Sequence, residues 1–183
     1  MRSVALPDGL PPQLIVISGL PGAGKSTIAS LVATRLGRAA HVEADVLHQM
    51  IVSGADQPTV EGTSEEAAQQ LALRLHHACL VAKSFLAAGF SAVIDDIIHG
   101  ARFHQLTEEL RDTPFTFVML HRNYDELRAS WINMGSPFID AWKWVSEEID
   151  HDTPRQGLWF DNASLSETAT VDRIVEYLGR SQR

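Results

Sequence analysis

Leu14-Ile-Val-Ile-Ser-Gly19-Leu-Pro-Gly-Ala-Gly-Lys-Ser-Thr27 is the stretch of sequence that decides the fold. It opens with a short apolar, largely β-branched run, which predicts a strand over residues 14–17 that is buried on both faces of a parallel sheet. The pattern Gly-x-x-x-x-Gly-Lys-Ser follows at residues 19–26. A helix is then expected over residues 24–36, with Gly37 as its stop. A glycine loop between a strand and a helix predicts a P-loop.

The chemistry of phosphate binding explains the spacing of this motif. Glycines allow backbone N–H groups to point inward around phosphate oxygens, and the start of a helix adds a positive partial charge. We therefore predict a site for a nucleoside triphosphate, in which Lys25 is a catalytic cation that reaches the β- and γ-phosphates. Ser26 is expected to place its hydroxyl on Mg²⁺. The predicted nucleotide-binding residues of the loop are Gly19, Leu20, Pro21, Gly22, Ala23, Gly24, Lys25, Ser26 and Thr27. A glycine turn without a ligand is the alternative.

Segments typical of strands and helices alternate through the rest of the chain. Strands are expected at residues 40–42, 90–94, 115–120 and 158–160, and helices after Asp45 and at 102–110, 125–134, 141–149 and 171–178, the last ended by Gly179. Thr63 and Glu66 form a capping box that opens the longest helix. The alternation predicts an α/β fold with a parallel sheet wrapped by helices. Residues 1–12 are expected to be a flexible lead-in, and residues 13–183 a single domain.

Composition narrows the class of protein. With 183 residues and 45% hydrophobic composition, the chain is long enough for one well-packed core. Its single cysteine, Cys79, cannot form an internal disulfide and is expected to be a small buried residue. The net charge of -8 disfavours binding along a nucleic-acid backbone. The sequence shows no signal peptide and no long apolar run, so we expect a cytoplasmic protein without membrane contact.

Three acidic residues stand where predicted strands end. Open parallel sheets bind ligands at the carboxyl ends of their strands, and we predict that Asp95 and Asp96 hold Mg²⁺ there or orient an acceptor. An ordinary turn at the end of the strand is the alternative. Asp45 follows the second strand, and we predict that it is the general base for an acceptor hydroxyl. Its alternative role is the N-cap of a helix that begins at Val46.

The segments Gly19 to Ser26, Val42-Glu-Ala-Asp45 and Val93-Ile-Asp-Asp96 together resemble the chloramphenicol phosphotransferase-like P-loop kinases, in the group that includes shikimate and gluconate kinases. The resemblance covers most of the chain. It implies transfer of the γ-phosphate of ATP to a hydroxyl of a small molecule, with Asp45 as the base. It also implies a three-layer P-loop NTPase fold, with a five-stranded parallel sheet of order 2-3-1-4-5 and a helical lid at about residues 129–154.

Arginines near the predicted lid supply further contacts that the resemblance implies. Arg128, on the helix after the fourth strand, is expected to bind nucleotide and to act in catalysis. Arg155 precedes the last strand, where related kinases touch the adenine, although an exposed, solvated arginine is an equal alternative. In the wider group of kinases, paired arginines of the lid clamp the transferring phosphoryl group. The predicted lid differs, because residues 129–154 contain no arginine and Lys143 is their cation. The clamp on the transferring phosphoryl group is therefore expected from Arg128, Lys143 or Arg155.

The acceptor is the part of the site on which several hypotheses stay open. The predicted acceptor contacts are Asp45, Asp96, Arg102 and Trp131, and His48 and His99 are weaker candidates. Aromatic residues around 135–137 suit an apolar or ring-bearing acceptor, with packing between lid helices as the alternative.

The leading hypothesis for the function is an ATP-dependent kinase of a small hydroxylated compound, for which an antibiotic is one candidate. A kinase of a metabolic sugar or acid, and a nucleotide-binding ATPase or switch, are the alternatives. The chain has no Asn-Lys-x-Asp run, which favours ATP over GTP. The oligomeric state is left open.

Overall fold

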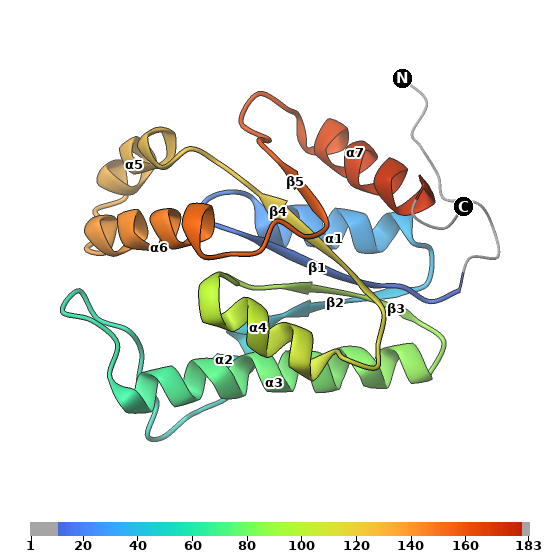
Figure 1. The fold of residues 1–183 in the computed structure, drawn as a ribbon, viewed down its shortest axis with the longest axis horizontal. Helices are drawn as coiled ribbons and strands as arrows, with labels where there is room; N and C mark the ends of the chain where they lie inside the picture. The colour runs from blue at the N-terminus through green and yellow to red at the C-terminus, as the bar shows by residue number, and fades with distance from the viewer. Residues whose placement is uncertain (1–10, 181–183) are drawn as a thin grey trace.

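The computed structural model describes residues 11–180. It contains a five-stranded parallel sheet with helices on both faces (Figure 1). Its elements are β1 (Leu14–Gly19), α1 (Lys25–Arg35), β2 (Ala39–Glu43), α2 (Ala44–Gln49), α3 (Glu65–Ala87), β3 (Ser91–Asp95), α4 (Gly100–Glu109), β4 (Phe115–Leu120), α5 (Tyr124–Asn133), α6 (Ile139–His151), β5 (Leu158–Phe160) and α7 (Glu167–Arg180). The strand order is β2-β3-β1-β4-β5, which confirms the expected P-loop fold. The predicted lead-in falls, apart from Pro11 and Pro12, outside the described residues.

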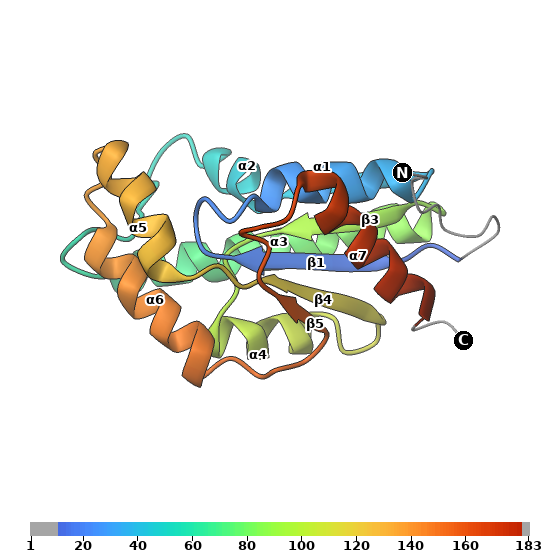
Figure 2. The ribbon, with the colours of Figure 1, turned by 90° about the horizontal axis from the view of Figure 1, so that it is seen from above.

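Alternation along the central strand builds one core on each face of the sheet. Leu14 and Val16 join the core that includes side chains of α3 and α4, whereas Ile15 and Ile17 join the core that includes α1 and α7. Figures 1 and 2 show these two helix pairs over opposite faces. Because β1 is buried on both sides, it carries a continuous apolar run instead of an alternating one. None of the helices within residues 11–180 is long and apolar enough to cross a membrane.

Two helix ends differ from the sequence predictions. The N-cap of α3 is Ser64, whose hydroxyl oxygen accepts a hydrogen bond from the N–H of Ala67. The capping box predicted at Thr63 and Glu66 is wrong, because the cap lies one residue later and Ala67 has no side-chain acceptor to complete a box. Helix α7 continues through Gly179 to Arg180, although Gly179 was predicted to end it.

The carboxyl ends of the strands bring the predicted site residues to one edge of the sheet. Asp95 at the end of β3 is in register with Ile17 of β1 and Glu43 of β2. The segments that follow these three strands therefore start side by side. Helices α5 and α6, which cover most of the predicted lid, lie at the same end of the sheet as the loop between β1 and α1 (Figures 1 and 2).

Candidate nucleotide and acceptor site

The predicted P-loop connects the end of β1 to the start of α1. A Cβ atom at Gly19 would lie 2.6 Å from the carbonyl oxygen of Leu120 on β4, so this position has no room for a side chain. Gly24 is the N-cap of α1 and has a left-handed φ of 89°, a conformation in which other residues are strained. The tertiary structure therefore requires glycine at both glycine positions of the motif.

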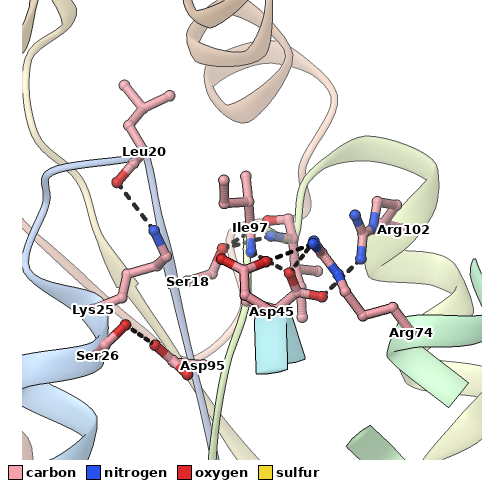
Figure 3. A network of polar contacts seen from close by, with 11 residues as sticks. Ser18, Leu20, Lys25, Ser26, Asp45, Arg74, Asp95, Ile97 and Arg102 are labelled. Carbon is pink, nitrogen blue, oxygen red and sulfur yellow. Dashed lines mark hydrogen bonds and ion pairs between the residues drawn. The ribbon is translucent and has the colours of Figure 1, made fainter. Parts of the chain in front are cut away.

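Ser26 and Asp95 form the position predicted for the metal ion. The hydroxyl of Ser26 donates a hydrogen bond to Oδ2 of Asp95 at 2.5 Å (Figure 3). Oδ1 of Asp95 lies 3.1 Å from Nε2 of His41. A hydroxyl and a carboxylate are hard oxygen ligands of the kind that Mg²⁺ prefers, and the ion takes its other ligands from water and substrate phosphates. The residues present thus fit Mg²⁺.

Lys25 is the buried cation of the site. Its Nζ donates a hydrogen bond to the carbonyl oxygen of Leu20 at 3.3 Å, inside the loop. Burial lowers the pKa of Lys25 below its usual 10.5, while attraction to Asp95, Asp96 and Asp45 opposes that shift. A phosphate group beside Nζ would favour the charged form of this lysine further.

A second group of charges, which we call the Arg74 network, consists of Asp45, Arg74, Asp96 and Arg102 (Figure 3). Arg74 lies in the middle of α3, and its Nη1 donates to Oδ1 of Asp45 at 2.6 Å while its Nη2 donates to Oδ1 of Asp96. Nη2 of Arg102, from α4, donates to Oδ2 of Asp96 at 2.7 Å. Two carboxylates and two guanidinium groups therefore cancel in charge. Arg74 could not be predicted as a site residue, because it sits within a long amphipathic helix and belongs to no motif.

The Arg74 network separates the roles of the two adjacent acids. Both oxygens of Asp96 accept from guanidinium groups, and the N–H of Ile97 also donates to Oδ1 at 2.7 Å. Asp95 instead faces Ser26, because successive residues of extended backbone point to opposite sides. The guanidinium groups around Asp96 repel a metal ion, which disfavours Asp96 as a ligand of Mg²⁺. Binding of Mg²⁺ by Asp95 stays a prediction.

Asp45 is the exposed end of the Arg74 network. Its side chain is 67% exposed, whereas that of Asp96 is 1% exposed. Arg74 holds Oδ1 of Asp45, and Oδ2 has no hydrogen-bond partner among residues 11–180. Asp45 lies in the first turn of α2, whose N-cap is Glu43, so the alternative N-cap role of Asp45 is wrong. A carboxylate that is fixed at one oxygen and open at the other suits a general base, and that role stays a prediction.

Trp131 lies against the P-loop and not in an open acceptor pocket. Its side chain is buried, and the indole Nε1 donates to the carbonyl oxygen of Pro21 at 3.2 Å. A Cβ atom at Gly22 would lie 3.7 Å from the same nitrogen. We therefore correct the predicted acceptor contact, because packing takes up this side chain. Its position supports the loop that is predicted to bind phosphate.

The predicted lid cations lie on or beside the lid helices. Arg128 is exposed on α5, and Lys143 is exposed on α6. Arg155 stacks over the ring of Trp159, with its guanidinium carbon 4.3 Å from the ring centroid, and pairs with Asp150 at 3.3 Å. Contacts of these cations with a nucleotide stay predictions.

The two histidines named as weaker acceptor candidates are both buried to a large extent. Nδ1 of His99 lies 2.8 Å from Oε2 of Glu148, which ties the segment after β3 to α6. Burial lowers the pKa of His99, although attraction to Glu148 opposes this. His48 lies inside α2, and neither of its ring nitrogens has a hydrogen-bond partner in the part of the chain that the structure describes.

Comparison with known structures shows where this fold recurs. The tunicamycin resistance protein of Deinococcus radiodurans is 17% identical, with a TM-score of 0.65 over 92% of this chain and 96% of that one. A gluconokinase from Sinorhizobium meliloti is 19% identical, with a TM-score of 0.60 over 94% and 98%. The APS kinase of Mycobacterium tuberculosis, in complex with AMPPNP and APS, is 17% identical, with a TM-score of 0.66 over 92% and 98%. At these identities the similarity shows a shared fold.

Sequence comparison gives the family. No curated protein matches the chain. Residues 14–124 match the family model described as AAA domain, which is more than half of the chain and includes the P-loop, the Arg74 network and Asp95. The protein therefore belongs to the AAA domain family, and its fold is that of the P-loop kinases.

Proposed function

We propose that this protein is an ATP-dependent phosphotransferase that moves the γ-phosphate of ATP to a hydroxyl group of a small molecule. The observation that carries the proposal is the environment of the Asp45 carboxylate. A buried arginine holds one of its oxygens, the other oxygen is open, and the carboxylate interacts electrostatically with Lys25. A nucleotide-binding switch needs the P-loop but has no use for a fixed and exposed carboxylate at this place. Membership of the AAA domain family and the kinases that share the fold support the proposal.

Each group of the site has a part in the proposed transfer. Residues 19–27 bind the phosphates, and Lys25 draws the β- and γ-phosphates into position. Ser26 and Asp95 hold Mg²⁺, which neutralises phosphate charge when it is bound. Asp45 accepts the hydroxyl proton through Oδ2 as the acceptor oxygen bonds to the γ-phosphorus and the bond from that phosphorus to the bridging oxygen of ADP breaks.

The lid side completes the proposed site. Arg128, with Lys143, is proposed to contact the transferring phosphoryl group, in place of the arginines that residues 129–154 lack. Arg155 is proposed to lie beside the adenine, since it already stacks on an aromatic ring. The narrower resemblance to the chloramphenicol phosphotransferase-like kinases, with an antibiotic as acceptor, stays a prediction.

The test is transfer of label from γ-labelled ATP, with Mg²⁺, to a panel of hydroxylated antibiotics, sugars, polyols and sugar acids. The wild-type protein is expected to label at least one compound faster than it releases labelled phosphate to water. Asp45→Asn is expected to lose transfer while ATP binding, measured by calorimetry, is retained. Asp112→Asn is the matched control, because it removes an exposed carboxylate that lies before β4, at the opposite edge of the sheet.

Two results would contradict this proposal. Hydrolysis to water with every member of the panel would favour the switch or ATPase hypothesis. Normal transfer by Asp45→Asn would remove Asp45 from the role of base, even if the protein is a kinase.

A further inference from the structure

Both arginines of the Arg74 network donate hydrogen bonds to carboxylates. Arg74 contacts Asp45 through Nη1 and Asp96 through Nη2, and Arg102 contacts Asp96 through Nη2. The side chains of these arginines are 9% and 17% exposed. The Nε atoms of both are buried and have no hydrogen-bond partner among residues 11–180. The two carboxylates therefore already neutralise both guanidinium groups.

An acceptor that carries an anionic group and draws these cations to itself would compete with Asp96 and Asp45 for them. Asp96 is 1% exposed, so a carboxylate or phosphate that took Arg102 from it would leave a buried charge with less compensation. Leaving one member of a buried ion pair without its partner is strongly unfavourable. The same competition would also weaken the hold of Arg74 on Asp45, which the proposed reaction requires.

The part of the Arg74 network that faces solvent is negative. Asp45 is its most exposed side chain, at 67%, and it is the group that an acceptor hydroxyl must approach. A like charge on the acceptor would be repelled at short range. Arg128 and Lys143, for which residues 11–180 supply no ion pair, come from α5 and α6, and the proposed function assigns them to the transferring phosphoryl group.

From this charge balance we infer that the acceptor is uncharged at the part that binds beside Asp45: a hydroxylated compound without a carboxylate, phosphate or sulfate group next to its reactive hydroxyl. The inference rests on the proposed function and names the substrate class of the same site. Among the acceptors that the sequence left open, it favours an uncharged antibiotic or a sugar over a metabolic acid.

The first test uses acceptors that differ in charge and little else. D-glucitol is compared with D-gluconate, glycerol with glycerate, and uncharged hydroxylated antibiotics are added, all with γ-labelled ATP and Mg²⁺. Transfer is expected to the uncharged members, with a kcat/KM at least about tenfold lower for the acid of any pair that reacts. A higher kcat/KM for an acid than for its uncharged partner would overturn the inference and leave the phosphotransferase proposal standing. Transfer to no compound would overturn both.

The second test asks whether freeing an arginine changes the preference. Asp96→Asn keeps the shape of the side chain and removes the charge that occupies Arg102. The ratio of kcat/KM for an acid to that for its uncharged partner is expected to rise by about tenfold or more, because a charge-assisted hydrogen bond becomes available. The double variant Asp96→Asn/Arg102→Gln is the matched control, and its ratio is expected to return toward that of the wild type.

The outcomes of the second test are distinguishable. An unchanged ratio in a folded Asp96→Asn variant would overturn the inference, because it would mean that Asp96 does not keep the arginines from the acceptor. Circular dichroism and thermal unfolding show whether the variant folds. If it does not fold, the matched acceptor pairs with the wild-type protein decide the question alone.

Discussion

Nη1 of Arg74 donates a hydrogen bond to Oδ1 of Asp45 at 2.6 Å and so joins the middle of α3 to the first turn of α2. The arginine is almost buried and the aspartate is exposed, so helix packing fixes the arginine and the arginine in turn fixes the carboxylate. Arg74 is a positioning residue in the proposed reaction, because it touches the base and not the reacting atoms.

Arg74→Lys is expected to lower kcat by about ten- to a hundredfold, because a single ammonium group cannot hold both Asp45 and Asp96 in the fork geometry of a guanidinium group. ATP affinity is expected to change little, since the P-loop contacts are intact. Steady-state kinetics with calorimetry of ATP binding measure the two effects. Arg111→Lys, an exposed position before β4, is the matched control. A fall in ATP affinity as large as the fall in kcat would contradict the positioning role.

Trp131→Phe is expected to lower the free energy of unfolding by about 1 kcal/mol, because it removes the hydrogen bond to Pro21 and leaves that carbonyl without its partner. ATP affinity is expected to fall as well, since the indole supports the P-loop from behind. Urea unfolding and ATP titration measure both quantities. Trp144→Phe, at a side chain that is 61% exposed, should change neither. Equal effects of the two substitutions would show that Trp131 has no particular link to the loop.

His99 is expected to make the protein less stable in acid. Burial lowers the pKa of His99 in the folded protein below its usual 6.5, so the unfolded chain binds this proton more readily. Its contribution to stability is present above the unfolded pKa and is lost as the pH falls below about 6.5. The free energy of unfolding of His99→Gln should therefore fall less steeply between pH 7 and about pH 5.5 than that of the wild type. A slope that stays the same in His99→Gln, as it should in the exposed control His104→Gln, would contradict this assignment.

Cys79 is expected to be unreactive in the folded protein. Burial raises the pKa of its thiol to about 12, and the side chain is fully enclosed in the core under α3. Labelling by a thiol reagent at pH 8 should then occur only through opening of the structure, and ATP with Mg²⁺ should slow it, because the ligand binds the folded state. The time course is followed by the absorbance of the thiolate that a chromogenic disulfide reagent releases on labelling. Rapid stoichiometric labelling of the native protein would contradict the buried position.

Local signals in the sequence predicted most of the architecture. The strands at residues 115–120 and 158–160 have the predicted bounds, and the other strands differ from prediction by one or two residues at an end. The P-loop was recognisable because the close approach of β4 excludes a side chain at Gly19 and the left-handed φ of Gly24 favours glycine there. The burial of Cys79 followed from its place on the apolar stripe of a helix. Such features depend on neighbours a few residues away, which is why a linear pattern reveals them.

Long-range pairing decided the rest. The sequence by itself determined that a P-loop, an Asp45 after the second strand and an acidic pair after the third would meet at one edge of the sheet. Only the tertiary structure showed that Arg74 reaches across 29 positions to Asp45, that Asp96 faces two arginines while Asp95 faces Ser26, and that Trp131 lies under the P-loop. The physical reason is that a charged or aromatic side chain in a helix looks the same in sequence whether it faces solvent or a partner. Its partner is set by how helices pack on the sheet.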